Sequence, residues 1–126
     1  MQPNVLKQFF VFLMSSGLFF SCSTQELRHE KIHIEHFYSL NSNGLIGADG
    51  GYRAISYEFC IPRKDRYMDV IKRIEPNIGC HNYSGRIGCS QEEYLCIGHT
   101  DQNYEDTFRK LVSLPFLHRI QESFFE

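Results

Sequence analysis

Three of the chain's five cysteines lie within residues 77–100, NIGCHNYSGRIGCSQEEYLCIGHT, a stretch that also carries a glycine-punctuated turn region. A fourth, Cys60, lies on an apolar segment before it, and Cys22 stands far upstream. With 126 residues the chain has room for one small domain, and small exported domains often depend on disulfides to supplement a modest core. Because five is odd, one cysteine of an exported and fully paired domain is expected to serve another purpose.

The N-terminal segment predicts export. Residues 9–20, FFVFLMSSGLFF, form an uncharged run of apolar and small residues, and Lys7 is the only charge before it. A run of about twelve residues has the length of a signal-peptide core, whereas a membrane-spanning helix needs roughly twenty. We therefore predict a signal peptide over residues 1–21.

The end of this run suggests how the signal is cut. Residues 18–22, LFFSC, resemble the lipobox of bacterial lipoproteins, in which the cysteine becomes the lipid-bearing first residue of the mature chain. The segment departs from that pattern at Phe19 and Phe20, where the family prefers leucine and a small residue. The resemblance implies lipidation at Cys22, and Ser23 after it is similar to the outer-membrane sorting pattern. The alternative is cleavage nearby by the ordinary signal peptidase, which would leave a soluble secreted protein.

Lipidation would also resolve the odd cysteine count. Removing the lipid-bearing cysteine from the five leaves an even number for pairing, as an exported domain requires. The four cysteines expected to form two disulfides are Cys60, Cys80, Cys89 and Cys96.

Residues 22–51 are predicted to form a tether followed by a Gly/Asn-rich loop, NSNGLIGADGG. The tether has helix propensity, although its isoleucines could equally begin a strand. On a helix, His29, His33 and His36 would share one face within reach of a Zn²⁺ or Cu²⁺ ion. The alternative without a metal site is a solvated, histidine-rich tether, and we favour this alternative.

Residues 52–126 are predicted to form the disulfide-stabilised domain. Apolar residues alternate over residues 53–61, which indicates a strand with one buried face. Helical patterns follow at residues 65–75 and from about 101 to 114, and further strands are predicted at 85–89, 94–100 and 118–126. The order predicts an α+β fold, a ferredoxin-like βαββαβ antiparallel sheet with two helices on one face.

This topology suggests a disulfide pairing. Its first and third strands are central neighbours, and Cys60 and Cys96 are expected on their faces away from the helices, with Leu95 pointing inward. We therefore predict a Cys60–Cys96 bridge across the two strands, with Cys80 and Cys89 closing the loop beside the second strand. Four cysteines allow three pairings, and this one fits the expected geometry best.

The same topology leaves one sheet face without helices over it. Ser56, Glu58 and Tyr94 are expected on that face, with Ser123 or Phe124 nearby. An open sheet face bearing a tyrosine is a reasonable protein-binding surface, and the alternative is a merely polar face turned to solvent.

Composition and motifs exclude several functions. A net charge of −2 argues against nucleic-acid binding, and the sequence contains no CxxC, GxSxG or HExxH motif that would indicate catalysis. We expect a non-enzymatic envelope protein, lipid-anchored on the periplasmic side of the outer membrane, that binds another protein or a cell-wall component. Inhibitor, immunity and accessory proteins are of this kind. The alternative is a metal-binding lipoprotein that uses the three histidines.

Overall fold

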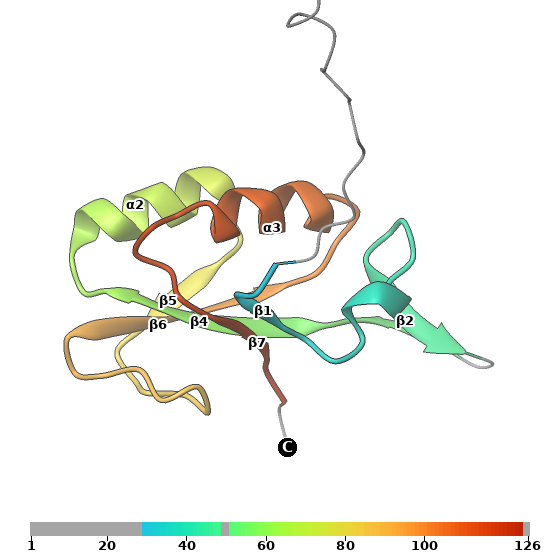
Figure 1. The fold of residues 1–126 in the computed structure, drawn as a ribbon, viewed down its shortest axis with the longest axis horizontal. Coiled ribbons are helices and arrows are strands. Elements are labelled where there is room, and N and C mark those ends of the chain that lie inside the picture. Colours follow the sequence, from blue (N-terminus) through green and yellow to red (C-terminus); the bar gives the residue numbers. More distant parts are fainter. Residues whose placement is uncertain (1–28, 49–50, 125–126) are drawn as a thin grey trace, which may run out of the picture.

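The computed structural model describes residues 29–48 and 51–124 (Figure 1). The predicted signal peptide, the lipobox-like segment and Cys22 lie outside the described residues, so their assignments stay predictions. The described chain is a mixed α+β domain in two layers, which confirms the predicted fold class at that level.

One layer is a five-stranded sheet with the strand order β1-β7-β4-β6-β5. All neighbouring strands pair antiparallel except β1 and β7, which are parallel. Both helices cover one face of this sheet (Figure 1). The sheet strands are β1 (Ile32–His33), β4 (Ser56–Pro62), β5 (Gly79–His81), β6 (Glu93–His99) and β7 (Ile120–Glu122), and the helices are α2 (Asp65–Ile74) and α3 (Tyr104–Val112).

The alternating strand and both helices form close to where the sequence predicts them. The apolar side of β4 faces the helices and is fully buried, as its period of two requires. The core on this side of the sheet contains Tyr57, Phe59, Ile61, Ile71, Phe108, Leu111 and Ile120. Burial of these side chains against α2 and α3 is the main apolar contribution to folding.

The predicted strand at residues 85–89 is wrong, because Gly79–His81 forms the edge strand instead. Residues 82–92 are a loop, and Gly85 and Gly88 within it have positive φ angles of 62° and 82°. Such backbone conformations turn the chain rather than extend it, and they favour glycine. Gly85 and Gly88 therefore shape a loop.

Residues 32–40, which the sequence places in the predicted tether, pack against the sheet and the core of the domain. Strand β1 pairs with β7, and the short 3₁₀ helix η1 (Phe37–Ser39) follows it. The Phe37 ring lies 5.1 Å from the Phe108 ring, centroid to centroid, and Ile34 and Leu40 are buried beside it. Lys31 Nζ donates hydrogen bonds to two carbonyls at the end of α3.

Residues 41–48 and 51–54, which include most of the predicted Gly/Asn-rich loop, form a turn and a two-stranded hairpin. The hairpin strands are β2 (Leu45–Ala48) and β3 (Gly51–Ala54), which pair antiparallel outside the main sheet. Thr100 ties this segment to the domain, because its hydroxyl donates to Gly44 O at 2.6 Å and accepts from Ile55 N–H at 2.9 Å. The hairpin projects from one end of the sheet (Figure 1).

Because Tyr57 is buried, the free energy of unfolding is expected to fall as the pH rises through the alkaline range. Burial, reinforced by the negative charges of Glu75 and Asp101, raises the pKa of its phenol well above the ordinary value near 10. Above about pH 10 the unfolded chain releases this proton while the folded chain keeps it, so stability present at lower pH is lost as pH rises. We expect the wild type to lose about 1 kcal/mol more than Tyr57→Phe between about pH 10 and pH 11. Urea unfolding at the two pH values tests this, and equal losses in both proteins would contradict it.

Candidate functional site

The sheet face away from the helices carries Ser56, Glu58 and Cys60 from β4, as the sequence predicts. The register of β6 against β4 differs from expectation, however, because Phe59 stands opposite Cys96 and Cys60 opposite Leu95. Residues directly opposite in an antiparallel pair point to the same face of the sheet. Cys96 therefore faces the helices and Leu95 faces away from them, which reverses the predicted orientation of this strand.

This register explains why the predicted disulfide pairing is wrong. Cys60 and Cys96 lie on opposite faces of the sheet, so they cannot bridge. Cys80 stands directly opposite Cys96 across β5 and β6, and the two are bonded on the helix side with a Cα–Cα distance of 4.1 Å. On the other face Cys60 is bonded to Cys89, with a Cα–Cα distance of 5.5 Å. All four cysteines are paired, as predicted, and two disulfides indicate an oxidising, exported compartment.

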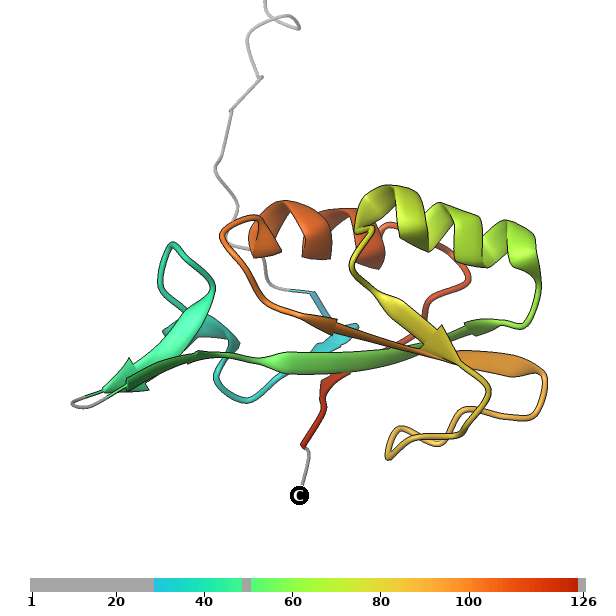
Figure 2. The same cartoon turned by 180° about the vertical axis from the view of Figure 1, so that it is seen from behind.

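The Cys60–Cys89 disulfide holds the loop of residues 82–92 beneath the sheet, on the side opposite the helices (Figure 2). Leu95 is only 1% exposed because this loop covers it. A Cβ atom at Gly85 would lie 2.7 Å from Leu95 Cδ2, and the positive φ of 62° at this position also favours glycine. The sequence predicted that this sheet face would be open. It is instead partly covered by the 82–92 loop.

Glu58 is the second attachment point of the loop. Its Oε1 accepts hydrogen bonds from the backbone N–H of Ile87 at 2.8 Å and from Gln121 Nε2 at 3.2 Å. Its Oε2 accepts a hydrogen bond from the Ser123 hydroxyl at 3.2 Å. These donors allow Glu58 to be only 2% exposed, and no buried side-chain polar atom of the described residues is left without a hydrogen-bond partner. Glu58 thus joins β4, β7 and the loop.

The predicted binding surface of Ser56, Glu58 and Tyr94 is consequently not assembled. Glu58 is buried, and the Ser56 hydroxyl is hydrogen-bonded to His99 Nδ1 at 2.8 Å. Tyr94 stands opposite the inward-facing Ile61 and therefore lies on the helix side of the sheet. The three side chains share no exposed surface.

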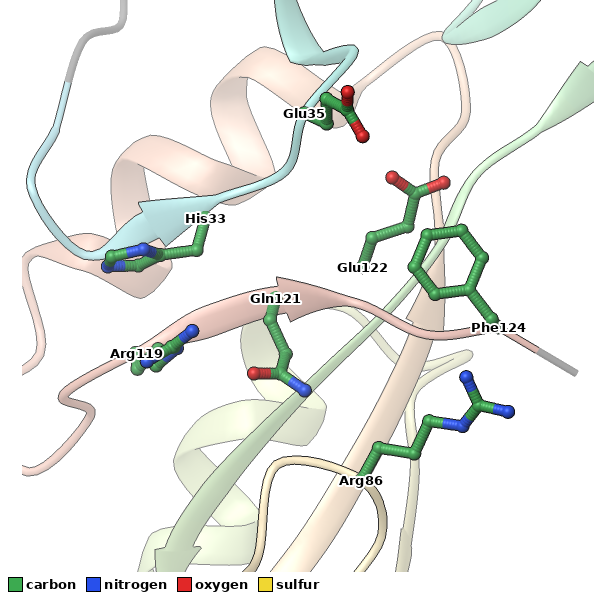
Figure 3. A pocket seen from close by; sticks show the side chains of 7 residues that line it. All are labelled: His33, Glu35, Arg86, Arg119, Gln121, Glu122 and Phe124. Carbon is green, nitrogen blue, oxygen red and sulfur yellow. The ribbon is translucent and has the colours of Figure 1, made fainter.

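A pocket of about 290 Å³ does open on this side of the sheet, where β1, β7 and the loop meet (Figure 3). We call it the β1–β7 pocket. Figure 3 shows Gln121 between one end with His33 and Arg119 and another end with Arg86 and Phe124. Its lining residues are His33, Glu35, Arg86, Arg119, Gln121, Glu122 and Phe124.

The β1–β7 pocket combines charges of both signs with an aromatic side chain. Its lining includes two arginines and two glutamates, and Phe124 is 55% exposed. Sequence reasoning placed Phe124 near a binding surface but missed the four charged residues. They come from three separate segments and form no motif. The pairing of β1 with β7 and the attachment of the 82–92 loop to β4 bring them together.

The histidines predicted as metal ligands are not arranged as the prediction requires. His33 is in β1 and His36 precedes η1, so no helix places them with His29 on one face. His29 Nδ1 instead accepts a hydrogen bond from the backbone N–H of Lys31 at 3.2 Å. Within residues 29–48 and 51–124, no group of three or more His, Cys, Asp or Glu side chains is placed to hold a metal ion.

Two further observations bear on assignment. None of the helices in the described part of the chain is long and apolar enough to cross a membrane. No family model, no curated protein and no solved structure matches this chain. The functional assignment therefore depends on the geometry described above.

Proposed function

We propose that this protein is an exported, lipid-anchored and non-enzymatic envelope protein that binds another envelope protein through the β1–β7 pocket. The observation that carries the proposal is that the exposed Phe124 and two arginines line the same pocket. Aromatic residues and arginine are enriched in protein interfaces and dominate their binding energy. A protein partner fits this combination better than a small apolar ligand, which would call for a mostly hydrophobic lining.

The exposed charges suggest what the partner presents. Arg119 suits a carboxylate group, and Glu35, whose side chain is 80% exposed, suits a basic side chain. A surface with both signs fixes the orientation of a partner and speeds association, and added salt weakens it.

We also propose that the domain has a ferredoxin-like fold. The strands β7-β4-β6-β5 support it, since numbered along the chain their order is 4-1-3-2 with antiparallel neighbours throughout. Both helices on one face support it as well. The strand β1 is then an addition to the edge of that sheet, and it creates one wall of the β1–β7 pocket.

Capture from intact cells tests the binding proposal. Crosslinking and affinity purification of the tagged full-length protein should recover one envelope protein in near-stoichiometric amount. Phe124→Ala and Arg119→Glu should each weaken this binding about tenfold, the effect of removing a hot-spot side chain. Tyr52→Ala is the matched control, because Tyr52 is a 67% exposed aromatic on the β2–β3 hairpin. Equal recovery with all variants would contradict the proposal.

The proposed anchor has its own test. Cys22→Ser removes the thiol that a lipid would modify, so this variant should move from the membrane fraction to the soluble fraction of the envelope. The folded domain should keep both disulfides, because Cys22 belongs to neither. Membrane retention of Cys22→Ser would show that something other than lipidation at Cys22 holds the protein there.

A further inference from the structure

A second pocket, of about 350 Å³, is lined by Arg63 and by the loop that covers the sheet. We call it the Tyr83 pocket. Its volume is near the lower end of the range for small-ligand sites, about 300–1,000 Å³. The chemistry of its lining differs from that of the β1–β7 pocket, because none of the described residues that line it is acidic. The side chains that matter here are Arg63, Asn82, Tyr83, Ser84, Ser90 and Gln91.

The Tyr83 ring is exposed and held in one orientation. It stacks on the imidazole of His81, with ring centroids 5.1 Å apart and an interplanar angle of 6°. The side chain is nevertheless 60% exposed. Since His81 covers one face of the ring, the opposite face is the one available to a ligand.

The polar groups around the ring suit a ligand with many hydroxyls. Asn82 and Gln91 each offer an amide that can both donate and accept, and the Ser84 and Ser90 hydroxyls do the same. A pyranose ring presents adjacent hydroxyls at its edge and a face of C–H groups that packs on an aromatic ring. The combination of one open aromatic face with neutral, two-way hydrogen-bonding groups therefore matches a sugar.

Arg63 adds one positive charge, and its position is fixed. Its Nε and Nη2 donate to Glu93 O at 3.3 and 3.2 Å, and its guanidinium lies 5.5 Å from the centre of the Tyr94 ring. Two of its five N–H groups are used in this way, so others can serve a ligand. Such a charge is compatible with uncharged sugars and with sugars that bear carboxylates.

The pocket is also preorganised, because the loop that carries it is held at two points. Cys89 lines the pocket and forms a disulfide with Cys60. The backbone N–H of Ile87 donates a hydrogen bond to the Glu58 carboxylate. Within the loop, Ser90 N–H donates to Glu93 Oε1 at 2.8 Å. A rigid loop loses little conformational freedom on binding, which favours affinity.

We infer that the Tyr83 pocket binds a polysaccharide of the cell wall, with one sugar ring packed on the open face of Tyr83. This ligand class differs from the protein partner proposed for the β1–β7 pocket, and the site is separate. The protein would then join a wall polysaccharide to an envelope protein.

Co-sedimentation of the purified full-length protein with insoluble peptidoglycan sacculi tests the inference. The wild type should sediment with the sacculi, and a soluble tetrasaccharide of N-acetylglucosamine should compete. Tyr83→Ala and Gln91→Ala should each weaken binding about tenfold or more. Tyr83→Phe keeps the ring and should retain most of the affinity. Tyr52→Ala again serves as the control, and thermal unfolding confirms that each variant is folded.

The outcomes separate the two proposals. Arg119→Glu should leave sedimentation unchanged, and Tyr83→Ala should leave capture of the envelope protein unchanged. Absence of wild-type sedimentation would overturn the glycan assignment, and so would equal sedimentation of folded Tyr83→Ala. Loss of the protein partner in Tyr83→Ala, without binding to sacculi, would show that this pocket is instead part of a protein interface.

Discussion

Replacing both Cys60 and Cys89 with alanine is expected to lower the free energy of unfolding by about 3–4 kcal/mol. The disulfide joins residues 29 apart in sequence, and its removal frees the unfolded chain from that closure. Urea unfolding monitored by far-UV circular dichroism measures the change. The native spectrum should change little, because Cys80–Cys96 still links β5 to β6 in the core.

The effect should be concentrated in residues 82–92. Hydrogen exchange of the Ile87 amide, which is bonded to Glu58, should become faster when the disulfide is absent. Arg86 lines the β1–β7 pocket and Tyr83 lines the other, so both binding activities should weaken in this variant. A loss of less than about 1 kcal/mol would mean that the disulfide does not restrain the loop as described.

Glu58→Ala is expected to cost about 2–4 kcal/mol, because it leaves buried donors without their acceptor. These donors are the Ile87 N–H, the Gln121 amide and the Ser123 hydroxyl. Chemical denaturation measures the loss. Glu58→Gln is the matched control, since its amide can still accept from two of the donors and bond the serine hydroxyl.

The control should cost clearly less than the alanine variant, about 1 kcal/mol. Glu58→Ala should also lower the free energy of unfolding by less when Cys60 and Cys89 are already replaced. The disulfide and the Glu58 hydrogen bonds hold the same loop, so their effects are not additive. Equal stability of Glu58→Ala and the wild type would contradict the anchoring role of this carboxylate.

The parts of the fold that are predictable from sequence are those with one buried face. Residues 53–61 place apolar side chains on one side only, so both the strand and its inward face follow from the pattern. The two helices likewise show a single apolar stripe, and Pro76 and Pro115 mark where they have ended. The local pattern predicts both the type and the orientation of these elements, because only one orientation buries their apolar side chains.

Strand β6 is different because it is buried on both faces. Leu95 is covered by the loop and Cys96 by the helices, so apolar residues point both ways and the pattern does not fix the orientation. The disulfide pairing depends on that orientation, and an error of one residue moves Cys96 to the wrong face. The loop that resolves the ambiguity is itself placed by the Cys60–Cys89 disulfide and Glu58.

The N-terminal part of the domain was missed for another reason. Ile34, Phe37 and Leu40 recur at a spacing of three, which resembles a helix, but their partners lie at the far end of the chain. Strand β1 is short and exists only through its pairing with β7. No local sequence pattern indicates such pairing, so the sequence does not predict the β1–β7 pocket either.

The covered sheet face and both pockets depend on the pairing of Cys60 with Cys89 and of Cys80 with Cys96. Peptide mapping of the unreduced protein, isolated from the envelope and digested with trypsin and glutamyl endopeptidase, tests it most directly. Cleavage at Arg63 or Arg73, at Arg86, and at Glu92 or Glu93 places the four cysteines on four separate peptides. We expect mass spectrometry to find Cys60 linked to Cys89 and Cys80 linked to Cys96. A Cys60–Cys96 peptide, or free thiols at these positions, would contradict the account.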